Sequence, residues 1–263
     1  MDNTFIVIQG YSISPETLQT MYDEYSKLGF KNILTSTYST SIPSNFKGEC
    51  IINDDILGKY DRNNYLNCPG LNYQILTTKK AINYIKEKYP NTKYILKIRA
   101  DHFLDKSDKF VESWIEELEN LEPIPNSPFE KKIVTMGLCT KYHSLTPGVW
   151  YISDYFNFGT LNDMSKLWNI STTFVDNGRA EDYISTFYLY KYFSKETDEF
   201  IAENLSNGSI LKYNLNVLDY FMFDWRTHSK ALYSYKLSKF ANEFSDTCRF
   251  RDPQHSYPFK QIS

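Results

Sequence analysis

The sequence Tyr94-Ile95-Leu96-Lys97-Ile98-Arg99-Ala100-Asp101-His102-Phe103 is a mostly apolar run that breaks off in Arg-x-Asp. Its β-branched and aromatic residues predict a buried strand. A guanidinium and a carboxylate at the carboxyl end of such a strand lie where open α/β sheets bind ligands. One fixed cation and one fixed carboxylate suit a diphosphate and a metal ion. A surface ion pair that contributes little to stability is the alternative.

Strands and helices alternate on the N-terminal side of this run. Ser14 and Pro15 form a helix start, Gly29 a helix end, and Pro90 stops a second helix that follows a polar loop at residues 60–73. Strands are predicted at residues 4–9, 31–37, 50–52 and 93–98. This alternation predicts an α/β protein with a mostly parallel central sheet and crossover helices on its faces.

The C-terminal side is less regular. Apolar spacing predicts helices at residues 107–120 and 161–168, and a third from residue 178 to about residue 193. A strand is predicted at residues 132–138 and an extended aromatic segment at residues 148–159. Because no internal repeat or linker separates these parts, residues 1–263 are expected to form a single domain.

Composition excludes several classes of function. The net charge is −3 and no basic block is present, so nucleic acid is not an expected partner. The 22 Tyr and 18 Phe suit sugar and nucleobase surfaces, although an AT-rich genome, bacterial or viral, would produce the same bias. The four cysteines form no Cys-x-x-Cys pair and therefore indicate neither a zinc site nor a disulfide framework.

The chain begins without a secretory signal pattern, and no apolar run reaches the roughly 18 residues of a membrane span. A cytoplasmic protein is therefore expected, in a bacterium or, for a viral protein, in the cytosol of the host. Peripheral contact with a membrane is left open.

Polar residues mark the ends of three predicted strands. The first strand ends in Gln9-Gly10, the second in Thr35-Ser36-Thr37, and the central one in Arg99-Ala100-Asp101. In a parallel sheet these ends share one edge, which is the expected place for a nucleotide. The chain contains no Gly-x-Gly-x-x-Gly, Walker, Gly-x-Ser-x-Gly or His-Glu-x-x-His motif.

Several blocks of the chain, in their order and spacing, resemble the WavE-type lipopolysaccharide-synthesis glycosyltransferases. The resemblance covers roughly residues 4–190. The blocks are IVIQG (6–10), ILTSTY (33–38), NYQI (72–75), LKIRAD (96–101), DYFNFG (154–159), MSKLW (164–168) and AEDY (180–183). The resemblance implies a GT-A-like (Rossmann-like) fold and a nucleotide-sugar donor. Residues 1–105 would then be a nucleotide-binding half, and residues 106–263 an acceptor-side half with a C-terminal extension.

The resemblance also implies where the donor binds. GT-A enzymes usually hold a divalent metal and the donor diphosphate on an Asp-x-Asp motif, and here Arg99 replaces the first Asp. Asp101 would ligate Mn²⁺ or Mg²⁺; alternatively, Arg99 pairs with phosphate directly. His228 is a candidate late metal or phosphate ligand, with a structural histidine as the alternative. The candidate donor-binding residues are Gln9, Gly10, Thr37, Asn72, Gln74, Arg99 and Asp101.

Catalysis is expected in the C-terminal half. The Glu181-Asp182 pair resembles the acidic pair that carries the base in inverting GT-A enzymes, with Asp182 as the first choice. Acidic residues that stabilise a helix N-terminus are the alternative. Asp154 is the candidate acceptor-binding residue, and a glycan is the expected acceptor. A non-catalytic carbohydrate-binding protein and a sugar nucleotidyltransferase are the competing hypotheses.

Overall fold

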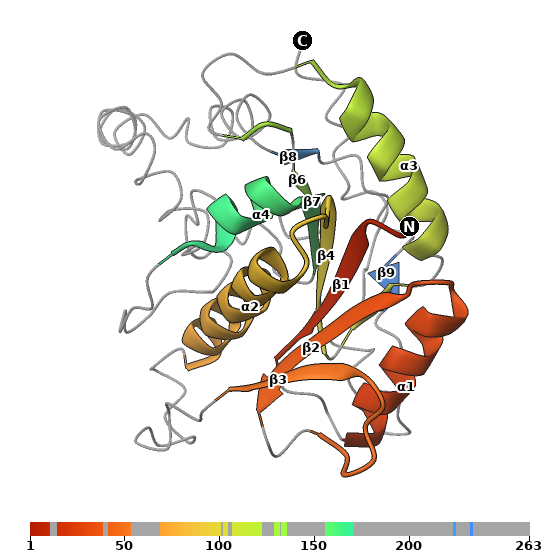
Figure 1. The fold of residues 1–263 in the computed structure, drawn as a ribbon, viewed down its shortest axis with the longest axis vertical. Coiled ribbons are helices and arrows are strands. Elements are labelled where there is room, and N and C mark those ends of the chain that lie inside the picture. Colours follow the sequence, from red (N-terminus) through yellow and green to blue (C-terminus); the bar gives the residue numbers. More distant parts are fainter. Residues whose placement is uncertain are drawn as a thin grey trace, which may run out of the picture.

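The computed structural model describes residues 1–10, 15–38, 42–53, 69–100, 102–104, 107–122, 129–131, 133–135, 156–170, 223–224 and 232–233. Within these ranges the chain forms an α/β structure with one large central sheet (Figure 1).

The central sheet has seven strands in the order β3-β2-β1-β4-β7-β6-β8. All neighbouring strands are parallel except where β7 pairs with β4 and β6, so β7 alone runs against the others. Its strands are β1 (Thr4–Gln9), β2 (Asn32–Tyr38), β3 (Glu49–Asn53), β4 (Tyr94–Arg99), β6 (Ile133–Thr135), β7 (Phe156–Thr160) and β8 (Phe223–Asp224). A separate pair consists of β5 (Phe103–Leu104) and β9 (Leu232–Tyr233). The expected α/β class with a mostly parallel sheet is confirmed.

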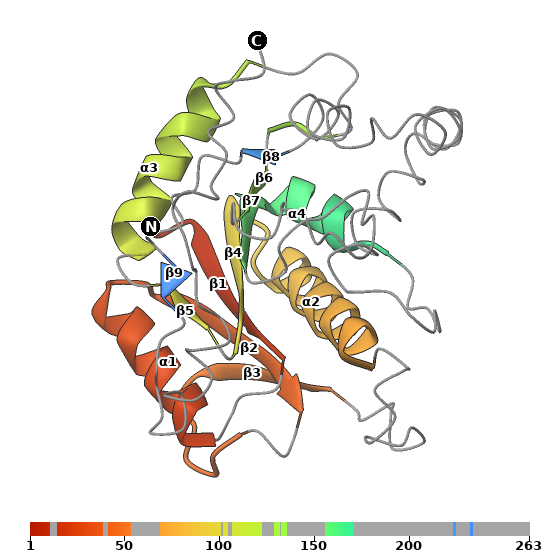
Figure 2. The same ribbon diagram turned by 180° about the vertical axis from the view of Figure 1, so that it is seen from behind.

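Helices cover both faces of the sheet. Helices α1 (Pro15–Lys27) and α3 (Ser107–Asn120) lie on one side, and α2 (Pro69–Lys88) and α4 (Leu161–Trp168) on the other, as the front and back views agree (Figures 1 and 2). In α1 and in α3, apolar residues spaced three or four positions apart form the buried side of the helix.

The main hydrophobic core lies between the sheet and helices α1 and α3. Ile6 and Ile8 from β1 and Leu96 and Ile98 from β4 belong to it, because alternate strand residues face one side. Trp114 of α3 stacks on Phe156 with ring centroids 5.4 Å apart. Burial of one side chain of this kind contributes about 1.5–3 kcal/mol.

The sequence predicted several element bounds correctly. Strand β1 and helices α3 and α4 have the predicted bounds, and β2, β3 and β4 differ from prediction by one residue at each end. Strand β7 falls within the predicted extended segment except for its last residue, Thr160. Strand β6 falls within the strand predicted at residues 132–138, whose other residues lie outside the described ranges. The helix predicted at residues 178–193 lies outside the described residues.

One prediction about α2 was wrong. The polar segment to residue 73 was expected to be a loop, but the helix begins at Pro69. Proline suits the first helical position because its fixed φ matches the helix and its missing N–H has no partner there. Strand β5 was not predicted, since two residues are too short to show a pattern. In the described part of the chain, no helix combines the length and apolar character needed to cross a membrane.

Candidate functional site

The carboxyl ends of β1, β2 and β4 meet at one edge of the sheet. Gln9 lies opposite Ser36 on one side and Arg99 on the other. The Gly10 N–H donates to the Ser36 carbonyl at 3.0 Å, and the Ala100 N–H donates to the Gln9 carbonyl at 2.8 Å. Strand pairing therefore continues to the last residue of each strand, and the structure brings these polar strand ends together as predicted.

Gly10 lets the chain leave this edge. Its φ is +100°, a conformation that residues with a side chain rarely adopt. The hydroxyl of Thr37 donates to the Gly10 carbonyl at 2.7 Å and fixes the turn.

The strand-end residues do not all face the same way. Residues paired in parallel register face the same side, so Gln9, Ser36 and Arg99 share the side covered by α2. The Ser36 hydroxyl donates to the Thr77 carbonyl of α2 at 2.7 Å. Thr37 alternates to the opposite side and is fully buried there. Its hydroxyl contact gives it a structural role in the turn.

Asn72 and Gln74 lie in the first two turns of α2, over the same edge. The Tyr38 ring, at the end of β2, packs edge-on against the Tyr73 ring with centroids 4.6 Å apart. Asn72 is buried and Gln74 half-buried. Because α2 begins at Pro69, Asn72 is the fourth residue of the helix and does not cap it.

Two buried oxygen atoms at this edge have no hydrogen-bond partner among the described residues. They are Oε1 of Gln9 and Oδ1 of Asn53. The Asn53 Nδ2 donates to the Ser36 hydroxyl and to the Thr37 carbonyl, both at 3.0 Å, which fixes its amide. Buried acceptors without partners are rare and costly. Nothing in the sequence pattern singled out Asn53.

A buried lysine lies two residues before Arg99 in β4. Lys97 is fully buried on β4, on the same side as Arg99, and its Nζ lies 4.9 Å from the centre of the Trp168 ring of α4. Its partner in β7 is Asn157, also buried. A desolvated cation over an aromatic ring is stabilised by about 2 kcal/mol. Sequence reasoning missed Lys97 because it occurs within an apolar run.

The described residues of this edge supply one guanidinium group and several neutral polar groups. Arg99 is half-buried at its last strand position, and the residues described around it (Gln9, Ser36, Asn53) are neutral. Within the described residues, no three His, Cys, Asp or Glu side chains cluster as a metal site would require. The other candidates lie outside the described residues: Asp101, Asp154, Glu181, Asp182 and His228.

A family model described as WavE lipopolysaccharide synthesis matches residues 31–237, which is more than three quarters of the chain. The chain belongs to the WavE lipopolysaccharide-synthesis family. The resemblance expected from the ordered sequence blocks is thus confirmed, and with it a place among glycosyltransferase-like proteins of glycan synthesis. The WavE match includes β2, β4, β7 and α2, and also the segments that carry Asp101, Asp154, Glu181 and Asp182.

A similar solved structure is described as the crystal structure of a glycosyltransferase involved in the glycosylation of the major capsid of PBCV-1. That protein is 14% identical in sequence to this chain, and the two structures have a TM-score of 0.38. The match covers 74% of this chain and 78% of the solved one. None of the curated proteins matches the chain.

Proposed function

We propose that this WavE protein transfers a sugar from a nucleotide-sugar donor to a glycan acceptor, with the donor bound at the carboxyl edge of β1, β2 and β4. The observation that carries the proposal is the pairing of Gln9 with Arg99 at that edge, beneath the first turns of α2. Ligands of open α/β sheets bind at this position, and the family works in lipopolysaccharide synthesis.

Arg99 is the proposed partner of the donor diphosphate. A guanidinium can donate two parallel hydrogen bonds to phosphate oxygens, and Lys97 adds a second positive charge on the same side of β4. Gln9, Gly10, Asn72 and Gln74 are proposed to bind the rest of the nucleotide.

Metal binding rests on residues outside the described ranges. A divalent ion would depend on Asp101 and His228. Bound there, Mn²⁺ or Mg²⁺ would neutralise charge on the leaving diphosphate.

The proposed base is Asp182, with Glu181 beside it. As the bond between the sugar and the diphosphate breaks, the base takes the proton of the acceptor hydroxyl, whose oxygen attacks the sugar carbon from the opposite side. The configuration at that carbon inverts. Asp154 is proposed to bind the acceptor.

The test is a screen of nucleotide sugars for thermal stabilisation, with and without Mn²⁺, followed by a hydrolysis and transfer assay with each donor that binds. A donor at 100 times its Kd stabilises the folded protein by about 2.7 kcal/mol. Activity should be stimulated by Mn²⁺ and lost in Asp101→Asn. The exposed Glu116 of α3 offers a control: Glu116→Gln should behave as wild type.

Full activity in Asp101→Asn would overturn the assignment of the site. If no nucleotide binds at millimolar concentration while oligosaccharides do, the chain is instead a carbohydrate-binding protein. Release of diphosphate from a nucleoside triphosphate and a sugar phosphate would identify a nucleotidyltransferase.

A further inference from the structure

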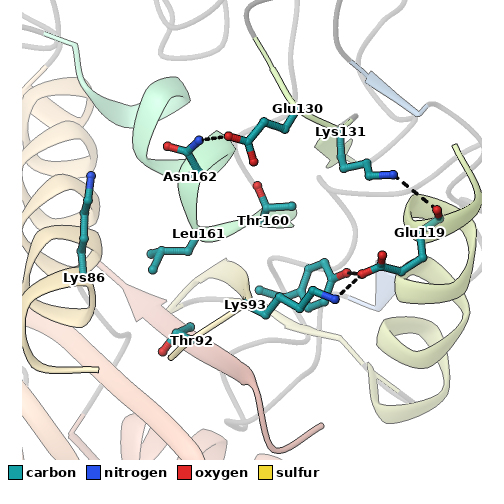
Figure 3. A pocket seen from close by; sticks show the side chains of 10 residues that line it. Lys86, Thr92, Lys93, Glu119, Glu130, Lys131, Thr160, Leu161 and Asn162 are labelled. Atoms are coloured by element: carbon teal, nitrogen blue, oxygen red, sulfur yellow. Dashed lines mark hydrogen bonds and ion pairs between the residues drawn. The ribbon is translucent and has the colours of Figure 1, made fainter. Parts of the chain in front are cut away.

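A pocket of about 370 Å³ opens at the amino end of β4, the end opposite Arg99 (Figure 3). The five steps from Tyr94 to Arg99 separate it from the proposed donor edge by roughly 16 Å, at about 3.3 Å per residue. Because β7 is antiparallel to β4, its last residue Thr160 and the start of α4 also reach this pocket.

Backbone hydrogen bonds hold the walls of the pocket. The Leu161 N–H donates to the Lys93 carbonyl at 2.9 Å and joins the start of α4 to the start of β4. The buried Asp163 carboxylate accepts the backbone N–H groups of Glu130 and Lys131, both at 2.9 Å. The walls are therefore fixed before any ligand arrives, which lowers the entropic cost of binding.

The end of α3 is tied to the same walls. The Lys131 Nζ donates to the Leu121 carbonyl at 2.9 Å, just beyond α3. The Lys93 Nζ lies 2.6 Å from Oε1 of Glu119, and the Tyr94 hydroxyl donates to the same oxygen. These contacts place one carboxylate and two ammonium groups on the α3 side of the pocket (Figure 3).

The lining combines hydrogen-bond donors and acceptors with little net charge. Three ammonium groups (Lys86, Lys93 and Lys131) are set against two carboxylates (Glu119 and Glu130), and Thr92 and Thr160 add hydroxyl groups and Asn162 an amide. The described contacts of both carboxylates use Oε1, so Oε2 of each is available to a ligand.

This chemistry selects against charged ligands. A polyanion would meet two carboxylates, and a polycation would meet three ammonium groups. A neutral saccharide meets neither penalty, because each hydroxyl group both donates and accepts a hydrogen bond. The volume lies within the range of about 300–1,000 Å³ typical of small-molecule sites.

We propose that this pocket is a second, non-catalytic site that binds a short neutral segment of a glycan. Binding there needs none of the donor-edge residues, so it does not depend on the proposed transfer reaction. A glycan acceptor bound in this pocket would stay near the proposed donor edge between transfer events. This raises the effective concentration of the acceptor at that edge.

The test is a titration of the ¹⁵N-labelled full chain with neutral oligosaccharides of four to six residues built from glucose, galactose, mannose or N-acetylglucosamine. Saturable shifts are expected at the backbone amides of residues 92–94, 130–131 and 161–162. The exposed pocket variants Glu130→Ala and Lys86→Ala should each weaken binding at least tenfold. The control Glu116→Ala, on the exposed surface of α3 outside the pocket, should bind as wild type.

The spectra also show whether each variant is folded. The proposal is overturned if none of the oligosaccharides shifts these amides, or if the two pocket variants, folded, bind as tightly as wild type. Arg99→Met separates the two proposals: it should abolish nucleotide binding while the saccharide shifts remain. Loss of the saccharide shifts in that variant would contradict a separate site.

Discussion

At the level of single residues, charge distinguishes the two edges of the sheet. Arg99 and the buried Lys97 leave the described donor edge with cations and no described carboxylate, whereas the opposite edge balances ammonium groups against carboxylates. A cationic edge favours phosphate because charge-assisted hydrogen bonds are roughly twice as strong as neutral ones.

The geometry of the Arg99 side chain should matter as well as its charge. Arg99→Lys keeps the charge but loses the planar pair of donors, so the Kd for a nucleoside diphosphate should rise about tenfold, equivalent to about 1.4 kcal/mol. Isothermal calorimetry with UDP and GDP measures this. Lys80→Met, on the exposed face of α2, is the control. An unchanged Kd in Arg99→Lys would show that Arg99 does not contact the diphosphate in two places.

The Asp163 carboxylate should be a major source of local stability. Burial raises its pKa, although hydrogen bonds from the backbone N–H groups of Glu130 and Lys131, a hydrogen bond with the Thr160 side chain and the charge of Lys166 oppose the rise. Asp163→Ala leaves two backbone N–H groups without acceptors, at about 1–3 kcal/mol each. The free energy of unfolding, from urea titration, should fall by at least about 2 kcal/mol. A change as small as that of Glu116→Ala would contradict this role.

The raised pKa of Asp163 also determines whether the free energy of unfolding rises or falls with pH. The folded state binds the proton of the Asp163 carboxyl group more tightly than the unfolded state does, so ionisation lowers the stability of the fold relative to the protonated form. The contribution of Asp163 to the free energy of unfolding should therefore fall as the pH rises from the ordinary pKa of 3.8 to the raised pKa, and it should stay level above that pKa. The difference in unfolding free energy between wild type and Asp163→Asn, measured from pH 3 to pH 7, should show this trend.

At the level of elements, the sequence predicted what local patterns encode. Continuous apolar runs rich in β-branched residues revealed β1 and β4, and helical spacing revealed α3 and α4. The early start of α2 was hidden because residues 60–73 are polar, and the helix there depends on tertiary contacts such as the Tyr38–Tyr73 ring pair. Asn53 and Lys97 were missed for the same reason: their environment arises from strand pairing across the sheet.

Strand β3 is joined to the end of α2 by one carboxylate. Oε1 of Glu49 accepts hydrogen bonds from Tyr84 and Lys88, both at 2.5 Å, and Oε2 accepts from Tyr89 at 2.8 Å. Partial burial raises the pKa of Glu49, but hydrogen bonds from Lys88, Tyr84 and Tyr89 together hold it below the ordinary value of 4.5. The network therefore favours the ionised form.

The stabilisation from Glu49 should depend on pH with the opposite sign to that of Asp163. It should be fully present above about pH 4.5 and lost as the pH falls through the lowered pKa. Because Glu49 is only half-buried and its partner Lys88 is exposed, Glu49→Gln should lower the free energy of unfolding by no more than about 1 kcal/mol at pH 7. The difference should shrink towards pH 3 in urea titrations. A constant difference across this range would show that ionisation of Glu49 is not the source.

For the whole molecule, the two faces of the sheet carry different tasks. The core that stabilises the fold lies under α1 and α3, whereas Gln9, Arg99 and the buried Lys97 lie on the side of α2 and α4. Stability and donor binding should therefore respond to different substitutions.

A pair of variants tests this separation. Leu118→Ala removes a buried α3 side chain of the core and should lower the free energy of unfolding by about 2–5 kcal/mol, with the Kd for nucleotide unchanged well below the melting temperature. Gln9→Ala removes an oxygen that has no partner among the described residues, so stability should change by less than about 1 kcal/mol while nucleotide affinity falls. Urea titration and calorimetry measure both quantities for each variant.

Weaker nucleotide binding in folded Leu118→Ala would contradict the separation, because the core face would then shape the donor edge. Unchanged affinity in Gln9→Ala would show that the Gln9 amide does not contact the nucleotide. The proposed binding position at the end of β1 would then be wrong.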